Sequence, residues 1–373
     1  MIILIILTLG AVGYFANERF ELVRNPFETP TPTATPTRTT LSFLSEAQSQ
    51  YEQGNIREAI QAFRVVADRE PDNDEVRREL ARLLIFDSEF DESLIFAREA
   101  EAINEDDARN LATLALALDW TSNYDDAYSY AQLAVALDPQ LSQAHGALAE
   151  VMADLGSWYQ AVDEAETAVE LDGRSMDAHR VLGYTHEVQG KYSEAIPHYQ
   201  KALELEPNLT FLYLTLGSNY RALATKQWGT KQADENFASS VEMFRKGLEI
   251  NPDDATLRFN LGKTLFQAGD QELGIRELRK AVELKPDMPE AYQQLAVNLY
   301  LRRAYEEAIE QMQKAIDLGN ESAINYYVVG LSYLNLEETD CEKGVPWLEK
   351  ALEIDPDSAP AREGLNRCGV SFP

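Results

Sequence analysis

The chain has 373 residues, and 63 acidic side chains against 33 basic ones give it a net charge of −30. Such a surface repels nucleic-acid phosphates and anionic lipid headgroups, so we expect neither as a partner. Only two cysteines occur, Cys341 and Cys368, and their spacing matches neither a metal-binding nor a CxxC motif. We therefore expect no metal site and no cofactor.

The first 16 residues, MIILIILTLGAVGYFA, form an uninterrupted apolar run. At about 1.5 Å per residue, a helix of this length spans about 24 Å, slightly less than the hydrocarbon core of a bilayer, about 30 Å. We interpret residues 1–16 as a transmembrane anchor. A cleaved signal peptide is the alternative interpretation, although no basic residue precedes the apolar run.

Residues 17–40 follow as a juxtamembrane segment and a Thr/Pro-rich disordered stalk, which includes the sequence PFETPTPTATPTRTT. Proline favours the extended polyproline II conformation, and such tracts are typical of exported stalks, although an ordinary linker is the alternative. Arg19 and Arg24 after the apolar run favour a cytoplasmic orientation by the positive-inside rule. The stalk favours the extracytoplasmic side, and we expect the rest of the chain there, with the cytoplasmic orientation left open.

An acidic helix end followed by a turn recurs along the rest of the chain, most often at a spacing of 34 residues. The turns fall at Pro71, Pro139, Gly173, Pro207, Pro252, Pro286, Asn320 and Pro356. A constant period in this range predicts a solenoid of helical hairpins.

Within each period, the eighth position carries a small residue that would let the paired helices approach closely. These residues are Ala47, Ala81, Ala115, Ala149, Gly183, Gly217, Gly262, Ala296 and Gly330. Glycines at 54, 156, 190 and 269 are expected to end the first helix of their unit in a left-handed conformation. One unit carries 11 extra residues between Tyr220 and Phe237, which predicts a longer hairpin that turns at Gly229.

This pattern resembles the tetratricopeptide repeat, W-x2-L-G-x2-Y followed by A-x3-F and P. The resemblance covers residues 41–358, with a capping helix and tail at 359–373. It implies an all-α, right-handed superhelical solenoid of about nine helical hairpins, whose first helices line a concave groove. Such a groove would bind a peptide or a partner helix.

Transferring the groove-facing repeat positions to this chain gives a mostly apolar and aromatic set that is interrupted by cations. These residues are Arg109, Leu116, Trp120, Arg180, Tyr184, Phe211, Leu214, Arg221, Phe259, Lys263, Phe266, Tyr300 and Tyr327. Burial of the aromatic side chains against neighbouring repeats is the alternative to ligand binding.

The two cysteines lie near the end of the repeats. Cys341 falls at the start of the second helix of the last full unit, and Cys368 ends the helix that follows. Consecutive helices of a solenoid touch, so a disulfide between them is geometrically feasible, and it would place the chain in an oxidising compartment. Two buried free thiols are the alternative.

The sequence contains no Gly-rich phosphate loop, nucleophile elbow or HExxH motif, and the repeats leave no room for a catalytic domain. We therefore expect no enzyme but a non-catalytic protein–protein interaction scaffold, tethered to the membrane, that binds another protein or peptide. One alternative is a structural or self-assembling component of the cell envelope, and self-association stays open. A carbohydrate-binding solenoid is the other alternative.

Overall fold

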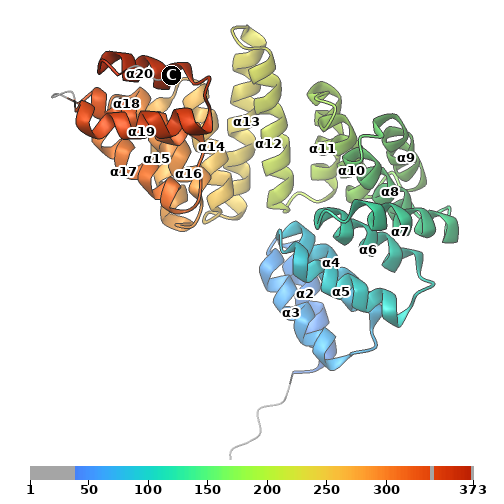
Figure 1. The fold of residues 1–373 in the computed structure, drawn as a ribbon. Coiled ribbons are helices and arrows are strands. Elements are labelled where there is room, and N and C mark those ends of the chain that lie inside the picture. Colours follow the sequence, from blue (N-terminus) through green and yellow to red (C-terminus); the bar gives the residue numbers. More distant parts are fainter. Residues whose placement is uncertain (1–37, 337–339, 371–373) are drawn as a thin grey trace, which may run out of the picture. The chain divides into compact units, whose positions relative to one another are not determined.

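The computed structural model describes residues 38–336 and 340–370, and throughout this part every regular element is an α-helix. Residues from Phe43 onward form one compact unit. Its hairpins follow one another in chain order (Figure 1), so the predicted all-helical solenoid is confirmed. The described residues contain nine hairpins and a closing helix, as the sequence predicts.

The nine hairpins pair each odd-numbered helix with the even-numbered helix before it. The helices are α2 (Thr40–Glu52), α3 (Ile56–Arg69), α4 (Asp74–Phe86), α5 (Phe90–Ile103), α6 (Ala108–Trp120), α7 (Tyr124–Leu137), α8 (Ser142–Asp154), α9 (Trp158–Leu171), α10 (Met176–Glu187), α11 (Tyr192–Leu205), α12 (Thr210–Lys226), α13 (Lys231–Ile250), α14 (Ala255–Gln267), α15 (Gln271–Leu284), α16 (Pro289–Leu301), α17 (Tyr305–Asp317), α18 (Ala323–Leu334) and α19 (Cys341–Ile354), followed by the closing helix α20 (Ala359–Arg367).

The anchor that we predict at residues 1–16 and the stalk up to residue 37 lie outside the described residues. A search of the described helices finds none with the length and hydropathy to cross a bilayer.

The small residue at the eighth position is buried in the hairpin interface. Ala81, Ala115 and Ala149 have no exposed surface. A methyl group added to Gly217 would lie 2.5 Å from the Phe244 ring, so only glycine fits there without movement of the ring. The structure therefore confirms that this position sets the close approach of the two helices.

In the hairpins from α2–α3 to α16–α17, the turn uses a left-handed residue. Gly54, Gly156, Gly190 and Gly269 have φ angles of 81°, 78°, 68° and 96°, as predicted for glycines that end a first helix. Ser88, Ser122 and Arg303 adopt the same conformation in other hairpins, with φ between 63° and 64°. The turn geometry is thus conserved along the solenoid even where the glycine is missing.

The predicted insertion lengthens one hairpin. Helices α12 and α13 have 17 and 20 residues, against 12 to 14 in the other paired helices. Gly229 makes the turn with a φ of 82°, and the Thr230 side chain accepts a hydrogen bond from the Ala233 amide at the start of α13. Trp228 beside this turn is 65% exposed and meets Phe237 edge-on.

The C-terminal end is closed covalently. Cys341, the first residue of α19, is disulfide-bonded to Cys368, the residue that caps α20. The predicted bridge is therefore present in the structure, in place of the two free thiols of the alternative.

Two distant parts of the solenoid also meet through what we call the closing contact. It joins Tyr51, Gly54, Ile56, Arg82 and Phe86, from the first two hairpins, to Asp177, Asn208, Leu209 and Phe211, from α10 and the start of α12.

The closing contact contains several kinds of interaction. The rings of Phe86 and Phe211 are stacked with their centroids 4.6 Å apart. The Asn208 side chain donates a hydrogen bond of 2.7 Å to the backbone carbonyl of Glu52, which lies 156 residues earlier in the chain. Solenoids are normally held together by contacts between neighbouring repeats alone, so this long-range contact is an addition to the basic fold.

Candidate functional site

A hollow of about 50 Å³ lies between the first helices α4, α6, α8 and α10. Three predicted groove residues, Leu116, Trp120 and Arg180, line it. Trp120 is 41% exposed and stacks on Phe90 with ring centroids 4.9 Å apart. The structure thus brings these three side chains to one surface.

Arg82 and Phe86 also line this hollow, although neither is among the predicted groove residues. The prediction began the groove at the third repeat. The same repeat positions in the second repeat fall on Arg82, Ile85 and Phe86, and all three line the hollow. Applying the positional rule one repeat earlier would therefore have found them.

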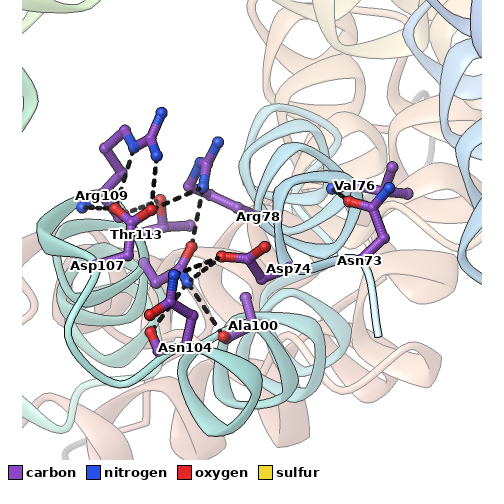
Figure 2. A network of polar contacts seen from close by, with 10 residues as sticks. Asn73, Asp74, Val76, Arg78, Ala100, Asn104, Asp107, Arg109 and Thr113 are labelled. Carbon is purple, nitrogen blue, oxygen red and sulfur yellow. Dashed lines mark hydrogen bonds and ion pairs between the residues drawn. The ribbon is translucent and has the colours of Figure 1, made fainter. Parts of the chain in front are cut away.

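We call the part from α4 to α10 the N-terminal stretch. Its predicted groove cations form ion pairs with carboxylates of the same chain. The Arg180 Nη2 atom lies 2.6 Å from Oε2 of Glu150, whose side chain is 1% exposed. Burial opposes the charge on Arg180, but Glu150 outweighs it and raises the pKa of the guanidinium. Arg109 makes an ion pair with Asp107 at 2.6 Å. Figure 2 shows this pair together with Arg78, which lies 3.9 Å from the same Asp107 carboxylate.

Excess acid is buried in the same stretch. Asp119 is 3% exposed, and its Oδ1 atom has no hydrogen-bond partner among the described residues. Burial, followed by repulsion from Glu150 and Asp154, raises the pKa of Asp119 to about 9. Asp154 in turn accepts a hydrogen bond from the hydroxyl of Tyr184, a predicted groove residue. These effects favour the neutral, protonated form of Asp119.

We call the part from α12 to α18 the C-terminal stretch. Its predicted cations are Arg221 on α12 and Lys263 on α14, and their environment is different. No carboxylate among the described residues makes an ion pair with either of them. Arg221 donates a hydrogen bond of 2.8 Å to the side-chain oxygen of Asn260, and its guanidinium lies 5.7 Å from the Phe244 ring centroid. Burial lowers the pKa of Arg221 to about 10. Burial and the charge of Arg221 lower the pKa of Lys263 as well.

The apolar groove residues of the C-terminal stretch are half-buried. Phe259, Phe266, Tyr300 and Tyr327 pack against the core of α15 to α18 yet keep part of their surface exposed. Leu214 packs against the core between α13 and α14. Phe211 is covered by Phe86 in the closing contact. These side chains therefore combine core packing with a partly exposed surface.

Three histidines gather on α10 and α11. The rings of His179 and His186 lie 6.3 Å and 5.7 Å from the ring of His198, nearly parallel to it. No cluster of His, Cys, Asp and Glu in the described part of the chain has the geometry to hold a metal ion.

Comparison with known protein families finds tetratricopeptide repeats in this chain. Family models described as tetratricopeptide repeat match residues 44–108, 177–209 and 231–289. A comparison with curated protein sequences gives no match.

Solved structures share the fold. The APC/C hetero-tetramer Cut9–Hcn1 matches with a TM-score of 0.64 and 17% identity, over 88% of this chain and 62% of that one. This chain thus spans less than two thirds of the matched Cut9–Hcn1 chain. The human IFIT1 dimer with PPP-AAAA matches with a TM-score of 0.60 and 16% identity, over 87% and 81%. At these identities the likeness shows the helical solenoid fold alone.

Proposed function

We propose that this protein is a non-catalytic scaffold that binds a segment of another protein along α12 to α18. The segment would carry a carboxylate, from an acidic side chain or a free C-terminus, beside apolar side chains. Tetratricopeptide folds generally mediate protein–protein interaction, and this supports the general class. The observation that carries the finer proposal is that neither Arg221 nor Lys263 makes an ion pair with any carboxylate in residues 38–336 and 340–370.

The environment of Arg221 and Lys263 differs from that of the other predicted groove cations. Among the described residues, carboxylates lie against Arg109 and Arg180 but form no ion pair with Arg221 or Lys263, although both of these are half-buried. Two neighbouring cations that are partly withdrawn from water repel each other, as the lowered pKa of Lys263 reflects. A carboxylate bound between them would remove this repulsion and make charge-assisted hydrogen bonds.

The apolar side chains beside the cations would provide the remaining binding surface. Phe259 and Phe266 lie on the same helix as Lys263, and Tyr300 and Tyr327 continue the row on α16 and α18. Half-buried aromatic residues are favourable anchors for a partner because they are already ordered before binding. A peptide with an acidic residue followed by apolar side chains would fit this order of groups.

We further propose that residues 1–16 anchor the scaffold in a membrane and that the solenoid lies on the extracytoplasmic side. The apolar run and the Thr/Pro-rich tract support the tether, and the disulfide supports an oxidising compartment. A tethered scaffold raises the local concentration of its partner at the membrane. Resistance of the protein to carbonate extraction would test the anchor, and alkylation of thiols in intact cells would test the compartment.

The binding proposal is tested with an array of synthetic peptides in which acidic and aromatic residues vary, each made with a free and with an amidated C-terminus. We expect the purified protein to prefer peptides with a carboxylate. Loss of binding on amidation would identify a C-terminal carboxylate, and retained binding an acidic side chain. Lys263→Glu should reduce affinity by about tenfold or more, because it replaces attraction with repulsion.

Lys246→Glu is the matched control, since it makes the same charge change at an exposed lysine on α13. It should leave binding close to that of the unmodified protein. Equal losses in the two variants, or equal binding of acidic and neutral peptides, would contradict the proposal. Capture of only other copies of the same chain would support the self-assembling alternative instead.

A further inference from the structure

The closing contact covers a residue at a groove-facing position. Phe211 belongs to the predicted groove, and its ring is stacked under Phe86 from α4. Tyr51, Ile56 and Phe86 pack together against the apolar cluster of Met176, Leu209 and Leu212. An apolar surface at the start of α12 is thus already occupied by side chains of the same chain.

We propose that the first two hairpins act as an intramolecular ligand, which covers the Phe211 end of the groove and must be released before a partner can occupy it. The closing contact is then an autoinhibitory contact. That a partner uses this end of the groove rests on the function proposed above. Release of the contact does not rest on it and can be measured separately.

The composition of the contact suits reversible release. Besides the apolar packing of Tyr51, Ile56 and Phe86, it is formed by a stacked ring pair, one hydrogen bond from an exposed asparagine, and an ion pair of 3.6 Å between Arg82 and Asp177. By contrast, each hairpin also packs against its neighbours in sequence, so the solenoid stays intact when the long-range contact opens. Elements held by few contacts open more readily than the core of a fold.

Charge near the contact also opposes closure. Burial, outweighing the attraction of Arg82, raises the pKa of Glu206, and Asp177 and Glu52 add repulsion. The carboxylates of Glu79, Asp177 and Glu206 therefore act on the single guanidinium of Arg82 in the closed form. Opening would return the half-buried Glu206 to water and relieve its repulsion by Asp177 and Glu52.

The turn at Gly54 offers a sharp test. A methyl group added there would lie 2.0 Å from the backbone oxygen of Asn208, so Gly54→Ala blocks closure. The substitution also strains the turn, because Gly54 has a φ of 81°. Gly156→Ala is the matched control: Gly156 has a φ of 78° in the equivalent turn of another hairpin, and no atom lies within 4 Å of its added methyl group. The two variants share the strain and differ only in the clash.

Hydrogen exchange measured by mass spectrometry reports on opening. We expect the amides of residues 209–212 to exchange faster in Gly54→Ala than in Gly156→Ala, while α14 to α18 exchange equally in both. Asn208→Ala, which removes the bond to Glu52 without straining the turn, should shift exchange in the same direction. Equal exchange of residues 209–212 in the two glycine variants would overturn the proposal.

Binding of the apolar anionic dye anilinonaphthalenesulfonate reports on the uncovered surface without any assumption about the natural partner. We expect Gly54→Ala to bind the dye about five to ten times more tightly than Gly156→Ala, because apparent affinity scales with the fraction of open protein. Adding Phe211→Ala to Gly54→Ala should abolish the gain. Faster exchange with no gain in dye binding would show that the contact covers no binding surface and would overturn autoinhibition. Failure of the peptide array alone would contradict the proposed function and leave these results standing.

Discussion

The two stretches of the predicted groove are built from the same repeat but treat their charges in opposite ways. Between α4 and α10, Arg109 and Arg180 are paired with carboxylates, and an extra acid, Asp119, is buried beside them. Between α12 and α18, Arg221 and Lys263 make no ion pair with a carboxylate of the described residues. One fold thus carries a stretch whose predicted groove cations are paired internally and a stretch whose cations are not.

Removing a charge should therefore have opposite consequences in the two stretches. Glu150→Gln leaves the buried Arg180 without its 2.6 Å partner and should lower the free energy of unfolding by about 3–5 kcal/mol. Arg221→Gln removes a charge that has no carboxylate partner in the described part of the chain, so it should change stability by about 1 kcal/mol or less. Urea denaturation followed by circular dichroism measures both. Similar losses in the two variants would show that the stretches do not differ in this way.

The two ends of the solenoid also differ. The first two hairpins are held by the side-chain interactions of the closing contact, whereas a disulfide holds the last two helices. The bridge spans 27 residues, and replacing both cysteines by serine should lower stability by about 2–4 kcal/mol through the entropy of the unfolded chain. The loss should be concentrated in α19 and α20, where hydrogen exchange would detect it. Uniformly faster exchange along the chain would instead show that the bridge stabilises the whole solenoid.

Substitution of Asp119 tests whether the N-terminal stretch buries more carboxyl groups than its cations can pair. Its pKa is about 9 in the folded protein against an ordinary value of 3.8, so its contribution to stability is complete below pH 3.8 and is lost as pH rises toward 9. Asp119→Asn, which stays neutral, should remove this loss and raise stability at pH 8 by about 1–3 kcal/mol. Thermal denaturation from pH 4 to pH 9 would show it, and Asp138→Asn, at an exposed position, is the control.

We expect the smallest effect on stability from the histidines on α10 and α11. Burial, and then the charges of His186 and His179, lower the pKa of His198 below its ordinary value of 6.5. Stability from this site is thus complete above pH 6.5 and is lost as pH falls through the lowered pKa.

The free energy of unfolding falls between pH 6.5 and pH 5 as the contribution of this site is lost. His198→Gln should reduce that fall by about 0.5–1 kcal/mol. Glu166, Lys191 and Glu194 act on His186 in the same cluster, with the two glutamates favouring its charged form. Denaturation series at these two pH values measure the difference. An unchanged pH dependence would show that the pKa of His198 is not lowered in the folded protein.

The local architecture could be read from the sequence because it depends on residues within one repeat. Gly217 and Ala149 mark the helix interface, Gly54 and Gly229 mark turns, and Cys341 and Cys368 fall on helices that touch. The charge pairing could not be predicted. Arg180 pairs with Glu150, which lies 30 residues earlier in the sequence, and the 63 acidic residues of the chain offer many alternative partners. The contact of Phe86 with Phe211 was also beyond prediction, because it depends on small rotations accumulated over several repeats.

The 156 residues between the partners of the Glu52–Asn208 hydrogen bond have a consequence for biosynthesis. A ribosome adds about 5–20 residues per second, so the first hairpin would wait about 8–30 s before the start of α12 has been made. During that interval Tyr51, Ile56 and Phe86 lack the surface that later covers them. The nascent chain would therefore carry a temporary apolar patch, a natural binding site for a chaperone that acts during translation.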